Sequence, residues 1–242
     1  MMKKIHYIYM VLVAVALASC NDWLDVQPHS QIEDSELFSS ESGYKEALAG
    51  VYSSMVGTST YAKEMTFGFI GVLGQEWDYY SSAQYDAVAT YDYEAAYPTN
   101  YINAIWKNNY TGISNVNNLL AHIDGGASLF SEDNYEVIKG EALALRAMLH
   151  FDLLRCFGVS FAVNPDMPSI PYSTALDYHV FPQLTVAEAA TQVLADLLQA
   201  EALLREADPI VTGRVITELD DNGYLINRRV HLNYYAVKAL QA

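Results

Sequence analysis

The chain has 242 residues and a formal net charge of −16 at pH 7, and hydrophobic residues make up 52% of it. A chain of this length forms one domain of ordinary size with a substantial core, or two small ones. Acidic residues outnumber basic ones, with 29 Asp and Glu against 13 Lys and Arg. This balance disfavours nucleic acid and anionic lipid surfaces as partners, so we predict no nucleic-acid partner.

Residues 1–19 are predicted to be a lipoprotein signal peptide. Lys3 and Lys4 precede the apolar segment 5–18, which is shorter than the roughly 20 residues of a transmembrane helix. Residues 17–20, Leu-Ala-Ser-Cys, match the lipobox at which bacterial lipoproteins are acylated and cut. Cys20 is therefore the predicted lipidation site, and its acyl chains would hold residues 20–242 at a membrane surface. The alternative is an ordinary signal peptide followed by a chance cysteine.

Apolar residues three and four positions apart predict helices over 41–56, 100–123 and about 132–157. The first has Ser39 or Ser40 as its N-cap and ends at Gly57. The third is apolar over more than one face, so we expect it among several neighbours. A fourth helix opens with a capping box at 185–188, and a fifth begins near Arg228 and runs to Ala242.

Two long irregular connections are predicted over 58–98 and 159–184, and the best strand candidates are 67–73 and 224–226. The predicted fold class is mainly α, with tetratricopeptide-like antiparallel helical hairpins and long irregular loops, although no 34-residue period is visible. The last helix has no glycine and no polar cap at its end. Either it frays into solvent or the sequence is the front part of a longer one, and we favour the second.

Several helical residues have predicted structural roles. We expect Trp106 and Tyr110 to pack in the core, and Asn117 to hydrogen-bond a buried carbonyl group. Arg146 is expected to be buried and hydrogen-bonded, so that replacing it with leucine would lower the melting temperature. Cys156 is expected to be a buried, unreactive thiol, because no histidine or basic cluster accompanies it.

The segment "GQEWDYYSSAQYDAVATYDYEAAYP" over residues 74–98 alternates aromatic and polar side chains. Sugar binding needs flat aromatic faces for the C–H side of a pyranose and fixed polar groups for its hydroxyls. Our hypothesis is that Trp77, Asp78, Tyr79 and Tyr80 form a ligand surface. The alternative is that these aromatic residues pack the long loop onto the helices.

Several stretches carry a family resemblance. In chain order they are Cys20 followed by "NDWLDVQP", then "IWKNNYTGISNVNNLL", "GEALALRAMLHFDLLRCFG", "IPY" at 170–172, "LTVAEAATQVLADLLQAEALL" and "RVHLNYYAVKALQA". Together they cover essentially all of residues 20–242. In this order they resemble the SusD/RagB family, the surface glycan-binding lipoproteins of Bacteroidetes.

The resemblance implies a lipoprotein anchored on the outer membrane that binds oligosaccharide and delivers it to a SusC-like TonB-dependent transporter. It also implies a helical domain with tetratricopeptide-like hairpins, no catalytic activity and no cofactor. Family members are about twice as long as this chain. Residues 20–242 are therefore expected to be the N-terminal helical domain of such a protein.

Two other classes of function remain open. No HExxH, G-x-S-x-G, phosphate loop or dinucleotide motif is present, and we assign no catalytic or metal-ligating residue. A glycoside hydrolase stays a remote alternative, because two carboxylates at a suitable distance suffice for that chemistry. The other alternative is a helical-hairpin lipoprotein that binds only proteins. Removal of Trp77 and Tyr80 would weaken a glycan binder and leave such a scaffold unchanged.

Overall fold

The computed structural model describes residues 34–176, 180–217 and 223–242. The predicted signal peptide, residues 1–19, and the predicted lipidation site Cys20 lie outside the described residues. Residues 37–242 form one compact unit.

The described part of the chain is mainly helical, which confirms the predicted fold class. The long helices are α3 (Glu41–Met55), α6 (Ala96–Ile123), α7 (Asn134–Phe157), α8 (Val186–Ala207) and α11 (Tyr234–Gln241). Short helices are α2 (Asp34–Leu37), α4 (Phe69–Leu73), α5 (Asp86–Ala89) and α9 (Pro209–Thr212), with 3-10 turns at Ala127–Leu129 and Arg228–Val230. Strands β1 (Pro168–Pro171) and β2 (Gln183–Thr185) form one antiparallel pair.

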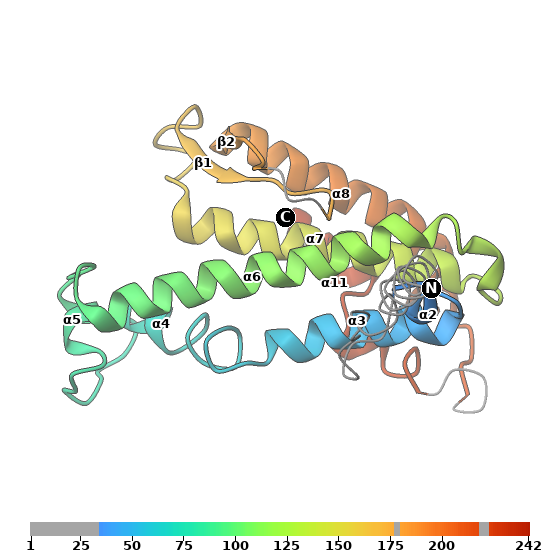
Figure 1. The fold of residues 1–242 in the computed structure, drawn as a ribbon, viewed down its shortest axis with the longest axis horizontal. Helices are drawn as coiled ribbons and strands as arrows, with labels where there is room; N and C mark the ends of the chain where they lie inside the picture. The colour runs from blue at the N-terminus through green and yellow to red at the C-terminus, as the bar shows by residue number, and fades with distance from the viewer. Residues whose placement is uncertain (1–33, 177–179, 218–222) are drawn as a thin grey trace, which may run out of the picture. The chain divides into compact units, whose positions relative to one another are not determined.

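Four long helices follow one another in alternating directions. Figure 1 shows α3 and α6 running antiparallel, and α7 and α8 forming a second antiparallel pair. Helix α7 packs against α6 and against α8, and its buried residues lie all around the helix. The expectation that this segment lies among several neighbours is therefore confirmed. Helix α11 packs on α8.

Local capping explains where two helices begin. The side chain of Ser40 accepts a hydrogen bond from the Gly43 amide at 3.3 Å, as an N-cap does. Thr185 and Glu188 form the predicted capping box, with each side chain accepting a hydrogen bond from the other residue's backbone amide. Helix α6 begins at Ala96, four residues ahead of the predicted start at residue 100. Pro98 lies in its first turn, where a proline is tolerated.

Both strand predictions are wrong. Residues 69–73 of the first candidate form α4, because the buried carboxylate of Glu64 accepts a hydrogen bond from the Phe69 amide at 2.8 Å at the start of that helix. Residues 224–226 lie in a turn. The observed strands instead come from the segment 159–184, which we predicted to be irregular, with β2 ending one residue beyond it at Thr185.

The last helix begins later than predicted. The segment starting at Arg228 forms a 3-10 turn, and α11 starts only at Tyr234. Asn233 ends the turn by donating a side-chain hydrogen bond to the Arg228 carbonyl at 2.8 Å. Its side-chain oxygen then accepts a hydrogen bond from the Ala236 amide at 3.0 Å, which makes it the N-cap of α11.

Arg146 ties α7 to two neighbouring elements. Its guanidinium donates two hydrogen bonds of 2.7 Å to the Asp196 carboxylate on α8 and one of 3.2 Å to the Asn117 side chain on α6. The amide of Asn117 in turn donates to the Ser173 carbonyl at 3.1 Å, and the hydroxyl of Tyr172 donates to Asp196 at 2.6 Å. The predicted roles of Arg146 and Asn117 are confirmed.

A second buried ion network joins the C-terminal segment to the helices. The Arg228 guanidinium pairs with the carboxylate of Glu141 on α7 and with that of Asp208 at 3.0 Å. Neither carboxylate is exposed to solvent. The hydroxyl of Tyr52 on α3 and the Nδ1 atom of His231 each lie 2.7 Å from Glu141 Oε1. This network fixes residues 224–234 against α3 and α7.

Trp106 and Cys156 are both less buried than predicted. Trp106 is 37% exposed, and its ring contacts Tyr110 and Phe157, the last residue of α7. The expectation that Trp106 lies in the core is therefore wrong. Cys156 is half-buried and unpaired, and burial raises the pKa of its thiol, which favours the protonated, unreactive form.

Candidate functional site

The connection from α3 to α6, residues 56–95, packs against the first half of α6. Its buried residues Met65, Phe69 and Val72, together with Val88 of α5, form a small core around Ile105. This core is separate from the two clusters that hold the long helices together. The segment is therefore held by its own core, with α4 and α5 near the start of α6 (Figure 1).

Glu64 anchors this segment. One carboxylate oxygen accepts the Phe69 amide, and the Tyr85 hydroxyl donates to the same carboxylate at 3.2 Å. The ammonium group of Lys63 lies 3.0 Å from Glu64 and 5.3 Å from the centre of the Tyr85 ring. One buried acid therefore links the start of α4 to the loop before α5.

Trp77 lies against α4. A Cβ atom at Gly71 would lie only 2.4 Å from the indole Nε1 of Trp77, so any other residue at this position would displace the indole. The Trp77 side chain remains 54% exposed. Its indole is thus seated on a helix at one edge while much of its surface faces solvent.

A cavity of about 570 Å³ lies beside this tryptophan, a volume within the range of ligand pockets. It is lined by Val72, Gln75, Glu76, Trp77, Asp78, Tyr79 and Ala89. Glu76 and Asp78 are exposed and form no ion pair or side-chain hydrogen bond with the described residues. The cavity thus combines an aromatic surface with carboxylates whose oxygens are available as hydrogen-bond acceptors.

The four residues of the ligand-surface hypothesis are placed differently from one another. Trp77, Asp78 and Tyr79 line the cavity, and Tyr79 also makes an edge contact with Tyr85, with ring centres 6.5 Å apart. Tyr80 is 99% exposed and is not part of the cavity wall. Sequence reasoning missed Gln75 and Glu76, although both directly precede Trp77.

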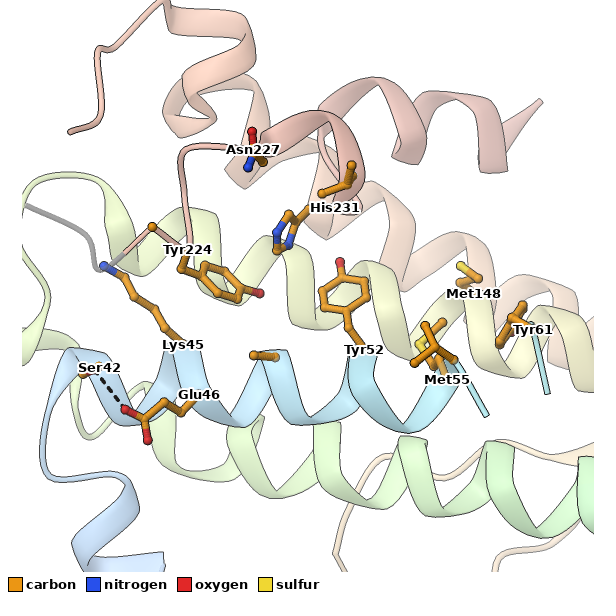
Figure 2. Close-up of a pocket in the computed structure, with 14 residues that line it drawn as sticks. Ser42, Lys45, Glu46, Tyr52, Met55, Tyr61, Met148, Tyr224, Asn227 and His231 are labelled. Atoms are coloured by element: carbon orange, nitrogen blue, oxygen red, sulfur yellow. Dashed lines mark hydrogen bonds between the residues drawn. The ribbon is translucent and has the colours of Figure 1, made fainter. Parts of the chain in front are cut away.

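A larger cavity of about 880 Å³ lies between α3 and residues 223–231, with Met148 of α7 in its wall (Figure 2). Most of its lining is apolar. Figure 2 shows Tyr52, Tyr224 and His231 pointing toward one another from α3 and the C-terminal segment.

Three polar side chains of the larger cavity already have a partner inside the protein. Tyr52, Tyr224 and His231 all hydrogen-bond the same Glu141 oxygen. Burial alone would raise the pKa of Glu141, but the Arg228 charge and the hydrogen bonds from His231 and Tyr52 hold this pKa below its usual value. These groups are therefore poorly placed to bind sugar hydroxyls, and we take the smaller cavity as the candidate site.

Among residues 34–176, 180–217 and 223–242, no group of side chains has the composition of a metal site. Within the same residues, no helix has the length and apolar character needed to cross a membrane.

Comparison with known proteins identifies the family. Residues 22–212 match the SusD-like family described as "Starch-binding associating with outer membrane". The chain belongs to the SusD-like family. No curated protein matches the sequence.

Solved SusD-like structures share the fold. A SusD superfamily protein from Bacteroides thetaiotaomicron is 22% identical with a TM-score of 0.59, covering 83% of this chain and 41% of its own. A putative sugar binding protein from Bacteroides vulgatus is 21% identical with a TM-score of 0.60, covering 84% of this chain and 41% of its own. A SusD-like carbohydrate binding protein from Bacteroides vulgatus is 23% identical with a TM-score of 0.55, and the match covers 68% of this chain and 36% of that protein. The SusD-like chain described here therefore spans less than half the length of these structures.

Proposed function

We propose that this SusD-like protein binds an oligosaccharide at the cavity beside Trp77, without catalysis. The observation that carries the proposal is the exposed indole of Trp77 beside the unpaired polar groups of Gln75, Glu76 and Asp78. Membership of a family described as starch-binding supports a carbohydrate as the ligand.

Each side chain of the cavity has its own role in the proposed binding. The indole face of Trp77 stacks on the C–H side of a pyranose ring, and Tyr79 supplies apolar surface beside it. The carboxylates of Glu76 and Asp78 accept hydrogen bonds from sugar hydroxyls. Tyr80, which extends into solvent, can close over a neighbouring sugar unit of a longer chain.

We further propose that the protein is anchored at the outer membrane through lipid on Cys20 and delivers its ligand to a SusC-like TonB-dependent transporter. The lipobox at 17–20 supports the anchor, and the family description supports association with the outer membrane. The test is purification of the native protein from detergent-solubilised outer membranes. Mass spectrometry should then find acyl chains on Cys20 and a co-purifying β-barrel transporter.

Replacing the exposed aromatic rings tests glycan binding. We expect Trp77→Ala to weaken binding of neutral oligosaccharides about tenfold or more, because a buried aromatic contact is commonly a dominant part of a binding site. Tyr80→Ala should have a smaller effect that grows with ligand length. The measurement is calorimetric titration with maltose-, xylose- and mannose-based oligosaccharides.

Tyr235→Ala is the matched control, because Tyr235 on α11 is 57% exposed and belongs to a different part of the chain. This variant should bind as the wild-type protein does. Unchanged affinity in a folded Trp77→Ala variant would remove Trp77 from the site and would favour the protein-interaction alternative.

The charge of the chain segment that contains the cavity residues predicts which glycans bind. No Lys, Arg or His occurs between Lys63 and Lys107, whereas six acidic residues do: Glu64, Glu76, Asp78, Asp86, Asp92 and Glu94. The nearest cation in sequence, Lys63, is already paired with Glu64. We therefore expect oligogalacturonate to bind at least about tenfold more weakly than neutral oligosaccharides of equal length, because like charges repel.

Salt and a charge-neutralising variant check this selectivity. Added salt should improve oligogalacturonate binding and leave neutral ligands unaffected, because salt screens repulsion between exposed charges. Asp78→Asn should narrow the difference between the two ligand classes. Equal affinity for both classes at low salt would show that the acidic residues do not face the ligand.

A further inference from the structure

The turn after α4 holds a non-glycine residue in the left-handed conformation. The Gln75 amide donates to the Val72 carbonyl at 3.0 Å, and the Glu76 amide donates to the Gly71 carbonyl at 3.0 Å. These two bonds define a Schellman motif, whose left-handed position is most often glycine. Gln75 occupies that position with a φ of 55°.

The backbone conformation of Gln75 is unfavourable for a residue with a Cβ atom. A glycine stands immediately before it, but Gly74 has an ordinary φ of −73° and does not relieve the strain. The Gln75 side chain forms no hydrogen bond with the described residues. Nothing among the described contacts of the folded chain therefore accounts for glutamine at a position that suits glycine.

The same turn sets where the Gln75 side chain lies. It reverses the chain at the end of α4, so that Trp77 returns to contact Gly71 on that helix. The side chains of Gln75 and Trp77 consequently line one cavity. The strained residue thus presents a primary amide, with both donor and acceptor atoms, beside the exposed indole.

We propose that Gln75 contacts the ligand and that the left-handed turn is kept to hold its amide beside the sugar unit stacked on Trp77. This inference rests on the proposed glycan site. Strained backbone positions that the surrounding structure enforces are concentrated at binding sites, where the strain fixes a functional group in place. Gln75 is therefore a contact residue, whereas Gly71 is a positioning residue that makes room for the indole.

The decisive variant is Gln75→Gly, which removes the amide and suits the left-handed turn. We expect its melting temperature to equal or exceed that of the wild-type protein, while its affinity for the neutral oligosaccharides named above falls about tenfold. Gln75→Asn should retain part of the affinity, because asparagine tolerates this conformation and keeps a shorter amide. The full chain is used, with melting temperature and calorimetric titration measured on the same samples.

Glu132→Gly is the matched control, because Glu132 also has a left-handed backbone, with a φ of 48°, and is not part of the cavity wall. It should leave affinity unchanged. Wild-type affinity in Gln75→Gly, with binding lost in Trp77→Ala, would overturn the role of Gln75 and leave the glycan site standing. Absence of any oligosaccharide binding by the wild-type protein would overturn both.

Discussion

Arg228→Met is expected to lower the free energy of unfolding by about 5 kcal/mol, the largest stability effect among these variants. The guanidinium of Arg228 is the cation between the carboxylates of Glu141 and Asp208, and neither acid is exposed to solvent. Removing the cation leaves two buried acids without their arginine partner, at a cost above that of one broken pair. For a chain of this size we expect a fall in melting temperature of more than about 10 °C.

The pH dependence of this variant identifies the cause. In the wild-type protein the pKa of Glu141 is lowered, so its contribution to stability is present at neutral pH and is lost on acidification. Without Arg228, burial loses the largest of the influences that oppose it, and the pKa of Glu141 should rise. The difference in melting temperature between the two proteins should therefore narrow from pH 7 to pH 5.

Arg205→Met provides the control for losing an arginine. Arg205 pairs with Glu201 one helical turn away, and its side chain is 54% exposed. Glu201 keeps Lys238 and Gln241 as partners in this variant, so we expect its melting temperature to stay close to that of the wild-type protein. Equal falls in melting temperature for Arg228→Met and Arg205→Met would show that the contribution of the Glu141 network to stability does not depend on its burial.

The long helices were predictable because their signals are local. Ser40, Thr185 and Glu188 cap helices from within the same few residues, and the apolar spacing of α7 indicates its central position. The strand prediction at 67–73 failed because a short apolar run does not distinguish a strand from one turn of helix. The deciding contact, Glu64 to the Phe69 amide, depends on how the preceding turn folds.

The candidate site was predictable in composition but not in geometry. Alternating aromatic and acidic residues drew attention to Trp77, Asp78 and Tyr79, which do line one cavity. Gln75 was missed because its importance comes from a left-handed backbone, and Gly74 would have been the expected residue for that conformation. The sequence also did not distinguish Tyr79, which lines the cavity, from its neighbour Tyr80, which projects into solvent.

The partners within the buried ion networks could not be predicted from the sequence either. Arg228 and Glu141 are 87 residues apart, and no local pattern links them. Arg146 could be predicted as buried from its place in an apolar helix, but its partner Asp196 lies 50 residues away on α8. Both networks join helices that the chain brings together only after it folds.

Arg146→Leu is expected to cost about 3 to 5 kcal/mol, because it leaves the buried Asp196 carboxylate with hydrogen bonds but no cation. This loss in the free energy of unfolding should exceed the loss caused by a leucine substitution at an exposed site of the same helix. Thermal or denaturant unfolding measures this loss of stability. The slope of the denaturant curve shows whether the two proteins expose the same amount of surface on unfolding.

The double variant Arg146→Leu/Asp196→Leu separates charge burial from packing. Removing both charges eliminates the uncompensated carboxylate, so we expect the double variant to recover much of the stability lost in Arg146→Leu. Recovery will be incomplete, because the Asn117 carbonyl oxygen and the Tyr172 hydroxyl each lose a partner. A double variant less stable than the single one would mean that Asp196 stabilises the protein mainly through its hydrogen bond from Tyr172, and not as the partner of Arg146. The contact of Arg146 with Asn117, lost in both variants, also helps to hold α6, the helix on whose first half the connection from α3 packs.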